Sequence, residues 1–271
     1  MLPLYIIDSF TSEPFKGNPA GVVIAGKPMD VARMQSIAKE LNFSETAFLS
    51  PLDAENDKET EWRIRYFSPL MEIPLCGHAT LASARVLFDR LAIQQLKFLT
   101  HSNVELIVTE TNGRIEMIFP VYSLTDDVAP VEMLKALGIK ETVYVGFNKE
   151  NNILMLEIES SEELASLEPD FVALLNSHDS IYAVSVTAKG HDQFDFHSRL
   201  FWPWAGGDED PVTGATHTFL AKHWSEKLGK TVMQSFQASP RTGQMEVELT
   251  NDNSLLIRGD AVLILEGELK V

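Results

Sequence analysis

The sequence predicts an α+β protein made of two similar halves, each a β-sheet wrapped around a buried helix. Two stretches rich in small residues, "CGHATLASARVLF" and "TGATHTFLAKHW", align with Gly77 on Gly214. Each is followed by strands and a late hairpin, "NVELIVTETNGRIEMIF" in one half and "GQMEVELTNDNSLLIRG" in the other. A repeat of this kind is typical of a duplicated unit. The alternative is a coincidence between two helix starts that are both rich in small residues.

Residues 120–130, "PVYSLTDDVAP", are predicted to link the two halves. The stretch contains two prolines and little hydrophobic pattern, which is typical of a domain boundary. We therefore expect an N-terminal domain over residues 1–122 with its central helix near 78–91. The C-terminal domain is expected over residues 123–271 with its central helix near 214–228, and its last strand could return to the first domain.

The elements of the first half follow from periodicity and turn residues. Residues 29–42 carry apolar side chains at helical spacing, and Asp30 suits the N-cap. Residues 76–91 are apolar or small on nearly every side, which predicts a buried helix. The pair Asn112-Gly113 indicates a type I′ turn between two strands. Strands are predicted over 2–10, 20–26, 45–51, 62–69, 96–100, 103–110 and 114–119, with a polar, acidic loop over 52–61.

The second half repeats the succession of helix and strands. A short helix is predicted over residues 131–138, followed by a hairpin around "NKENN" and a helix over 161–176. Strands are predicted near 180–188 and 193–201. A helix over 214–228 then precedes strands that continue to the C-terminus.

Composition and charge exclude several classes of protein. The 271 residues, 45% of them hydrophobic, are enough for one large core or for two domains. No continuous apolar run is long enough for a bilayer, and "MLPLYIIDSF" lacks the basic region of a signal peptide and is predicted to be the first strand. The net charge of −17 disfavours nucleic acid as a partner. The single cysteine excludes an internal disulfide and indicates a cytoplasmic protein.

No metal or nucleotide motif is present in the sequence. The seven histidines are scattered, without HExxH or Cys/His spacing, and one cysteine cannot build a cysteine-rich site. "GGDEDPVTG" lacks the Gly-Lys-Ser/Thr of a Walker loop, and no GxGxxG follows a strand. We therefore expect no metal and no cofactor.

Gly77 and Gly214 each stand at a predicted helix start. The first N–H groups of a helix have no partner inside it, and the helix dipole adds positive charge there. If both starts face one cleft, they could hold a carboxylate between them, because a glycine lets a ligand approach the backbone closely. The alternative is that both glycines only ease the packing of helix against sheet. The residues alone leave both interpretations open.

Three polar residues stand where predicted elements begin: Glu45, His78 and Asp210. Each has an ordinary interpretation, as a solvated glutamate, a packed histidine and a helix N-cap, and Thr213 is an equally suitable cap. A histidine at the positive end of a helix resists protonation. Such a residue suits the role of a neutral hydrogen-bond partner or proton shuttle.

Four stretches in a fixed order resemble the PhzF-like family, named after a phenazine-biosynthesis isomerase: "SEPFKGNPAGVV", "NFSETAF", "YFSP…LCGHATLASA" and "EDPVTGATH". The resemblance covers essentially the whole chain, including "RGDAVLILEGEL", and points to the mostly uncharacterised branch of the family. It implies the diaminopimelate-epimerase-like fold, with two similar domains, each a curved mixed sheet around a central helix, and a site in the cleft between them. It also implies a cofactor-free enzyme and a homodimer.

The same resemblance implies roles for individual residues. Glu45 looks like the general acid/base that removes and returns a proton. His78 and Asp210 look like polar groups that orient the substrate and assist proton transfer. The substrate-binding positions that it implies, chiefly backbone groups that hold a carboxylate, are Asn18, Gly77, Gly214 and Ala215.

The sequence departs from related proteins at two points. The epimerases of this fold use two opposed cysteines, whereas here Cys76 matches one position and Pro211 stands at the other. Two-thiol racemisation therefore cannot operate. The phenazine enzyme has Gly-Ser-Ala where this chain reads Gly214-Ala215-Thr216, so a substrate-contacting hydroxyl is missing, and we expect the Thr216 side chain to point elsewhere. This second departure bears on the substrate more than on the reaction class.

We therefore expect a cytoplasmic PhzF-like isomerase that acts by proton transfer on a small unsaturated, cyclic carboxylate. Family members of known chemistry move a hydrogen and shift double bonds in a cyclic amino-hydroxy carboxylate. One alternative is a non-catalytic module that binds a carboxylate or a protein, and another is a racemase that uses Glu45 and a second base. The expected partners are a small anionic substrate and a second copy of the chain, with no nucleic acid and no membrane.

Overall fold

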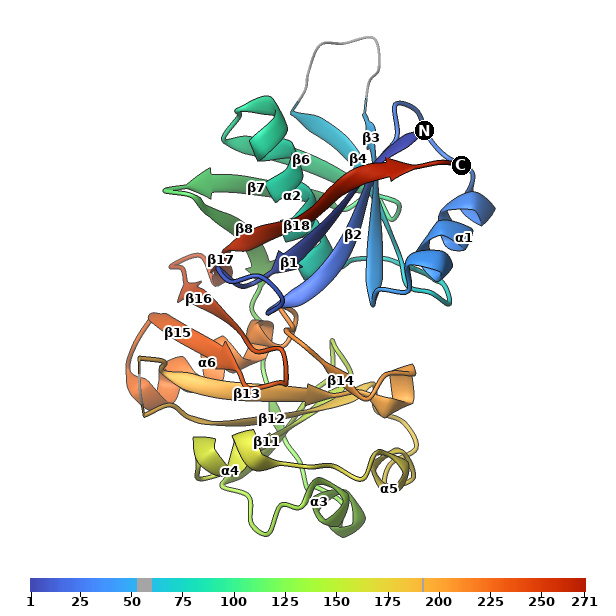
Figure 1. Ribbon diagram of the computed structural model, residues 1–271. Coiled ribbons are helices and arrows are strands. Elements are labelled where there is room, and N and C mark those ends of the chain that lie inside the picture. The colour runs from blue at the N-terminus through green and yellow to red at the C-terminus, as the bar shows by residue number, and fades with distance from the viewer. Residues whose placement is uncertain (53–59, 192) are drawn as a thin grey trace. The chain divides into compact units, whose positions relative to one another are not determined.

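The computed structural model describes residues 1–52, 60–191 and 193–271, which form two compact units (Figure 1). Unit 1 contains Met1–Ile118 together with the C-terminal segment Ile257–Val271, and unit 2 contains the residues between them. The division falls just before the predicted linker rather than within it. Most of the polar loop predicted over residues 52–61 lies outside the described residues.

Unit 1 is built on a mixed β-sheet. Its strands, in chain order, are β1 (Leu2–Ser9), β2 (Asn18–Ile24), β3 (Glu45–Pro51), β4 (Glu61–Phe67), β5 (Glu72–Ile73), β6 (Gln95–Thr100), β7 (Glu105–Thr111), β8 (Arg114–Pro120) and β18 (Ala261–Leu269). Helix α2 (Gly77–Leu91) packs against β1, β2, β3 and β18, and it lies behind β1 and β18 in Figure 1. Helix α1 (Val31–Leu41) packs against β3 and β4.

Parallel and antiparallel pairings alternate through this sheet. Strand β1 is antiparallel to β18 and to β2, β2 is parallel to β3, and β3 is antiparallel to β4. Strand β4 is parallel to β6, β6 is antiparallel to β7, and β7 is antiparallel to β8, while the short β5 lies antiparallel on β4. Helix α1 makes the crossover between the parallel strands β2 and β3, and α2 makes the one between β4 and β6, as parallel pairing requires.

Local signals in the first half are confirmed at particular residues. The Asp30 carboxylate accepts a hydrogen bond from the Arg33 N–H at 3.2 Å, which caps α1. Helix α1 ends at Asn42 in the left-handed conformation (φ 55°). Asn112 and Gly113 both have positive φ, 54° and 82°, as a type I′ turn requires.

Helix α2 is buried on most sides, as predicted. Its residues from His78 to Ala84 are all buried. The charged side chains lie on the remaining face, where Arg85 forms ion pairs with Asp89 at 2.5 Å and Glu110 at 2.7 Å. Within the described ranges, no helix combines the length and the apolar character that crossing a bilayer requires.

Unit 2 repeats the pairing order of unit 1. Its strands are β9 (Thr125–Asp126), β10 (Tyr144–Asn148), β11 (Ile153–Glu157), β12 (Ala183–Lys189), β13 (Phe196–Phe201), β14 (Glu209–Asp210), β15 (Val232–Gln237), β16 (Gly243–Leu249) and β17 (Ser254–Gly259), the last of which continues into unit 1. Strands β10 to β16 pair antiparallel, parallel, antiparallel, parallel and antiparallel in turn, omitting β14. This is the succession found from β1 to β7, omitting β5.

The repeat extends to the helices that follow the short strands. Strand β14 lies antiparallel on β13, as β5 does on β4. Helix α6 (His217–Leu228) follows β14, as α2 follows β5, and packs against β15 and β16. The weak repeat in the sequence therefore coincides with a repeat in strand pairing.

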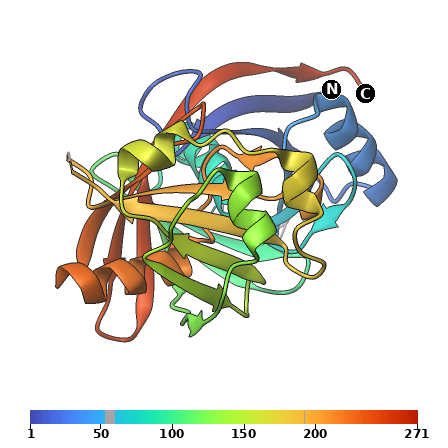
Figure 2. The ribbon, with the colours of Figure 1, turned by 90° about the horizontal axis from the view of Figure 1, so that it is seen from below.

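The single helix predicted over residues 161–176 is wrong, because the structure has two short helices there. These are α4 (Ser161–Ser166) and α5 (Phe171–Leu175), each with its own N-cap. Pro169 lies between them, and proline disfavours helical backbone at the residue before it and has no N–H to donate. With α3 (Val131–Leu137), these helices cover one side of the unit 2 strands and share a buried cluster with β11 and β12 (Figure 2).

The helix predicted from residue 214 begins later, at His217. Residues 214–216 form turns instead, and the 3₁₀ helix η1 (Pro203–Ala205) precedes them. The N–H of His217 donates to the Gly214 carbonyl at 3.1 Å, and the N–H of Thr218 to the Ala215 carbonyl at 3.2 Å. These bonds between residues three apart are typical of a tightened helix start.

The loop between β1 and β2 depends on Gly17. Its φ is +66°, and a Cβ at this position would lie 2.2 Å from the Ser9 carbonyl oxygen. The Asp8 carboxylate fixes the same loop by accepting a hydrogen bond from the Phe15 N–H at 2.7 Å. Since β2 begins at the next residue, Asn18, this loop sets the register in which β2 starts.

We predict that Gly17→Ala destabilises the protein, because alanine has a left-handed penalty of about 1–2 kcal/mol and its methyl group would overlap backbone that cannot move freely. The free energy of unfolding, measured by denaturant titration, should fall by at least that amount. The matched control is Gly26→Ala, since a Cβ on Gly26 meets nothing within 4 Å. Equal stabilities of the two variants would contradict this account of the loop.

His217 joins α6 to β15 inside unit 2. Its Nδ1 lies 2.9 Å from the Thr213 carbonyl oxygen and its Nε2 lies 2.7 Å from Ser235 Oγ. A carbonyl oxygen only accepts, so Nδ1 carries the proton and Nε2 accepts from the serine hydroxyl. Burial lowers the pKa of His217 to about 4, because the charged ring would lose its hydration.

The pKa of His217 predicts a loss of stability in acid. The unfolded histidine takes up a proton near pH 6.5 and the folded one does not until about pH 4, so stability falls as pH falls through that window. The full loss is on the order of 3 kcal/mol. His217→Gln should show a shallower fall in unfolding free energy between pH 6.5 and 4 than the parent protein. Identical pH profiles would contradict the prediction.

Candidate active site

Glu45 and His78 meet inside unit 1. Glu45 is the first residue of β3, and the parallel pairing of β3 with β2 sets it opposite Ala20. His78 is the second residue of α2. Both are buried, with relative exposures of 7% and 6%, and Glu45 Oε2 lies 3.3 Å from His78 Nε2. The ordinary interpretation of Glu45 as a solvated charge is therefore wrong.

The contacts of His78 define a short chain of polar groups. Its Nδ1 lies 3.4 Å from Cys76 Sγ, and its Nε2 lies 3.5 Å from Ser44 Oγ. If the Glu45 carboxylate is ionised it only accepts, so Nε2 carries the proton and Nδ1 is left to accept from the thiol. A proton can then pass along thiol, imidazole and carboxylate without any of them leaving the site.

Burial lowers the pKa of His78, and the nearby Glu45 carboxylate opposes that shift only in part. The imidazole is therefore neutral near pH 7. A neutral His78 was expected from its place at the helix start, but the main cause is burial. The neutral ring can donate to the carboxylate and accept from a neighbour at the same time.

Ser9, Asn18 and Ser44 form hydrogen bonds around the Glu45–His78 pair. Ser9 Oγ donates to the His78 carbonyl at 2.8 Å. Asn18, fully buried at the start of β2, has its Oδ1 3.5 Å from Ser44 Oγ. Asn18, Gly77, Glu45 and His78 are thus brought to one part of unit 1, as expected. Sequence reasoning missed Ser9 and Ser44, although Ser44 stands directly before Glu45 in "NFSETAF".

Cys76 lies within the same cluster. The thiol is buried, and one ligand-type atom each of Glu45, Cys76 and His78 lies within 4.8 Å of the other two. The Cys76 carbonyl accepts from Thr80 Oγ1 at 2.6 Å, which fixes the start of α2. The sequence identified Cys76 only as a match to an epimerase position.

In unit 2, Asp210 belongs to the short strand β14, where it pairs with Leu200. Its side chain is 7% exposed overall and accepts a hydrogen bond from Thr213 Oγ1. Helix α6 has Thr216 at its N-cap without a side-chain cap bond. Asp210 and Thr213 are therefore not helix caps, and their ordinary interpretation is wrong.

The stretch after Asp210 is held by the end of β15. Gln237 Nε2 donates to the Asp210 carbonyl at 2.7 Å, and Gln237 Oε1 accepts from the Thr213 N–H at 2.9 Å. Ser239 Oγ donates to the Pro211 carbonyl at 2.7 Å. Nothing in the sequence near either residue signals this role, since the bonds join positions far apart in the chain.

The turn that leads into α6 presents the second glycine. Gly214 is buried and Ala215 is exposed. The Thr216 hydroxyl donates to the Thr213 carbonyl at 2.9 Å, so it serves the loop itself. The Ala215 carbonyl accepts from Thr218 Oγ1 at 2.6 Å. The local chain therefore uses the hydroxyls and carbonyls of this turn internally.

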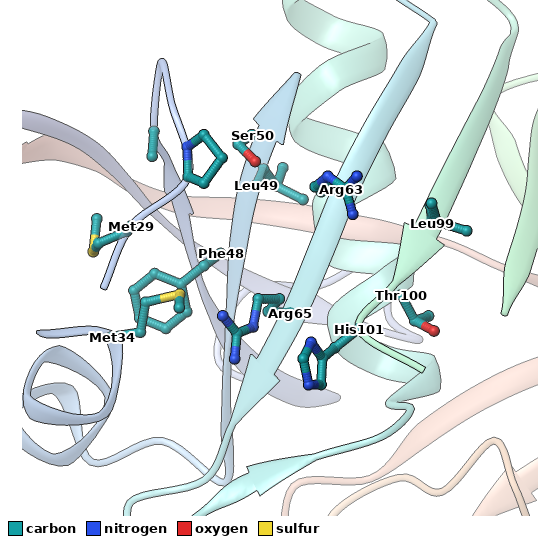
Figure 3. A pocket seen from close by; sticks show the side chains of 12 residues that line it. Met29, Met34, Phe48, Leu49, Ser50, Arg63, Arg65, Leu99, Thr100 and His101 are labelled. Carbon is teal, nitrogen blue, oxygen red and sulfur yellow. The ribbon is translucent and has the colours of Figure 1, made fainter. Parts of the chain in front are cut away.

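A pocket of about 380 Å³ lies elsewhere in unit 1 (Figure 3). Met34 and Phe48 form part of its apolar lining, and Arg63 and Arg65 point toward it from β4. The Arg65 guanidinium binds the Glu72 carboxylate with two bonds of 2.7 and 2.6 Å. None of the sequence-predicted site residues lines this pocket, so it is distinct from the Glu45 cluster.

Comparisons with known proteins assign the chain to a family. Residues 7–267 match the PhzC-PhzF family, described as "Phenazine biosynthesis-like protein". A relative from Halalkalibacterium halodurans, named an uncharacterized isomerase, is 38% identical, and the alignment covers 98% of each chain. The mouse protein named phenazine biosynthesis-like domain-containing protein 2 is also 38% identical, over 99% of each chain. A Pseudomonas aeruginosa relative, 38% identical over 99% of this chain and 98% of its own, is likewise named an uncharacterized isomerase, and this chain is an enzyme of that class.

Solved structures show the same mixed α/β fold. A PhzF-family crystal structure from Enterococcus faecalis superposes with a TM-score of 0.90 at 37% identity, covering 100% of this chain and 99% of that one. The fold also resembles that of a probable proline racemase from Agrobacterium radiobacter, with a TM-score of 0.62 at 10% identity over 100% of this chain and 93% of the other. The chain therefore belongs to the PhzC-PhzF family of phenazine biosynthesis-like proteins.

Proposed function

We propose that the chain is a cofactor-independent isomerase that moves a proton within a small unsaturated, cyclic carboxylate, with Glu45 as the acid/base. The observation that carries the proposal is the buried contact of the Glu45 carboxylate with a neutral histidine. Burial keeps most water away from this carboxylate, and the contact with His78 fixes its orientation for proton transfer.

The reaction that follows balances without any further reagent. Glu45 removes a proton from a carbon next to the unsaturated system, and the electron pair of that C–H bond moves into the conjugated double bonds. The same proton, now on Glu45, returns to a different carbon as the double bonds shift. Nothing is oxidised or reduced, so no redox cofactor is needed. Donation from His78 Nε2 orients the Glu45 carboxylate and stabilises its charge before the first transfer and after the second, when the proton is on carbon.

The substrate carboxylate would be bound by backbone N–H groups. The proposed positions are Gly77 and His78 at the start of α2, where the helix dipole favours an anion, and Gly214 and Ala215 before α6. Asp210 would orient the polar end of the substrate. Participation of residues from both units in one reaction, in a cleft between the two domains as the resemblance implies, is part of the proposal.

A cytoplasmic homodimer completes the proposal. The location is inferred from the single cysteine and the dimer from the family resemblance. Racemisation by two thiols is excluded chemically, because Cys76 is the single cysteine of the chain.

We predict that Glu45→Gln abolishes turnover while ligand binding is largely kept, because the amide preserves shape but cannot accept a proton from carbon. The measurement is proton NMR in D₂O with a panel of small cyclic unsaturated carboxylates, following deuterium uptake and double-bond position. The matched control is Glu157→Gln. Glu157 is also a buried carboxylate that contacts a histidine, His223, at 2.7 Å, but it belongs to unit 2 and also pairs with Lys227.

Each outcome of this experiment has a definite meaning. Turnover in the parent protein and in Glu157→Gln, with loss in Glu45→Gln, supports the proposal. Turnover that survives in Glu45→Gln contradicts the assignment of Glu45 as the base. A panel compound that raises the melting temperature but is never converted favours the non-catalytic binding module instead.

Gln237 is proposed as a positioning residue for the Asp210 stretch. Gln237→Leu leaves the Thr213 N–H and the Asp210 carbonyl without their partner, which should cost about 1–3 kcal/mol of stability. It should also raise KM more than it lowers kcat, because the loop binds the substrate and does not take the proton. The control is Gln234→Leu on the same strand, which removes only a bond to Glu246. An unchanged KM in Gln237→Leu would argue against the positioning role.

A further inference from the structure

We propose that Glu45, Cys76 and His78 form a binding site for a zinc ion, which would inhibit the enzyme reversibly. The site comes from tertiary structure alone. Cys76 and His78 are separated by one residue at the start of α2, and Glu45 comes from β3, so their spacing matches no metal motif. The sequence-based expectation that the chain binds no metal did not consider this arrangement.

The separations of the three groups approach those of a zinc tetrahedron. With Zn–N and Zn–O distances near 2.1 Å and Zn–S near 2.3 Å, the edges between ligand atoms measure about 3.4–3.6 Å. Here Glu45 Oε2 and His78 Nε2 are 3.3 Å apart, and His78 Nε2 and Cys76 Sγ are 3.9 Å apart. All three ligand atoms lie within 4.8 Å of one another. Binding of one ion by all three groups requires the wider separations to close to these edge lengths.

The ligand types select the metal. Thiolate and imidazole favour zinc over magnesium or calcium, which prefer oxygen ligands. Three protein ligands leave a fourth tetrahedral position for water or a substrate oxygen, as in zinc sites that are not purely structural. The thiol must lose its proton to bind, so metal uptake should release protons and strengthen as pH rises.

A second carboxylate–histidine pair shows what the site requires. Glu157 contacts His223 at 2.7 Å, but Lys227 Nζ lies 2.5 and 2.7 Å from the two Glu157 oxygens. A cation already occupies that carboxylate, and the single cysteine of the chain, Cys76, belongs to the other unit. In the Glu45 cluster, by contrast, the Cys76 thiol contacts the His78 imidazole.

Zinc and the substrate proton would compete for the same oxygen of Glu45, and inhibition follows from this competition. The inhibition, unlike the binding of zinc, rests on the proposed function. A zinc ion on Glu45 occupies the lone pair that would take the proton from carbon, and it converts His78 from donor to ligand. Metal and substrate turnover are then mutually exclusive. Removal of the ion by a chelator restores the free carboxylate, so the inhibition should be reversible.

The experiment is a titration of the apo protein with Co²⁺, which enters zinc sites and gives a visible spectrum. A thiolate-to-cobalt charge-transfer band would report on Cys76 and nothing else, because the chain has a single cysteine. Zn²⁺ should then displace Co²⁺ and abolish the band at one equivalent per chain. Zinc affinity is measured separately by competition with a coloured chelator.

Three variants make the titration decisive. Cys76→Ser should lose the band, and Glu45→Gln should keep the band but bind zinc at least about tenfold more weakly, a loss that even outer-shell partners of a metal cause. The control is His101→Ala, since His101 is exposed and lies at the other pocket, and it should behave as the parent does. Melting curves of each variant establish that it is folded.

The outcomes separate this proposal from the isomerase proposal. A parent protein that binds Co²⁺ without a charge-transfer band, or that binds zinc no more tightly than Cys76→Ser, overturns the zinc site. So does a Glu45→Gln variant with unchanged zinc affinity. None of these results bears on proton transfer, which the D₂O experiment tests without metal.

Discussion

The buried contact between the Glu45 carboxylate and the His78 imidazole is the constraint on which the chemistry of unit 1 depends. A buried polar group needs a hydrogen-bond partner, and here the Glu45 carboxylate and the neutral His78 imidazole are partners for each other. The parallel pairing of β2 with β3 and the crossover helix α2 deliver the two groups to one point. The loop that ends at Gly17 sets where β2 starts, and Ser9 fixes the His78 backbone.

The two units use one pairing order for different chemistry. In unit 1 the helix after the short strand begins with "CGH" and carries reactive side chains beside a buried glutamate. In unit 2 the equivalent helix begins at His217, whose ring is committed to Thr213 and Ser235. There the proposed substrate-binding part is the loop before the helix, which the Gln237 amide holds by two hydrogen bonds. The same pairing order thus carries the proposed proton-transfer pair in one unit and a hydrogen-bonded loop in the other.

The same three atoms of unit 1 support two uses that exclude each other. As a proton relay, the thiol, imidazole and carboxylate must each carry or accept hydrogen. As metal ligands, they must present lone pairs to one ion. Under the two proposals, the free metal concentration decides which use prevails. The neutral histidine suits either, because it needs only to change tautomer.

The sequence by itself determined the elements whose signals are local. Asp30 caps α1, Asn112 and Gly113 form their turn, and α2 is buried because it is apolar on nearly every side. The motifs also identified Glu45, His78 and Asp210 as the residues to examine. The prediction of one long helix over residues 161–176 was wrong, because Pro169 interrupts it. Apolar residues continue at helical spacing across the proline, so the periodicity alone does not reveal the break.

Only the tertiary structure decided what those residues touch. The Glu45–His78–Cys76 cluster joins a strand to a helix start, and Gln237 reaches back to Asp210 and Thr213 from another strand. Such contacts depend on sheet register, which is set by the packing of the whole unit and leaves no mark in the spacing of the residues. The same holds for burial, which lowers the pKa of His78 and His217 through the loss of water around each ring.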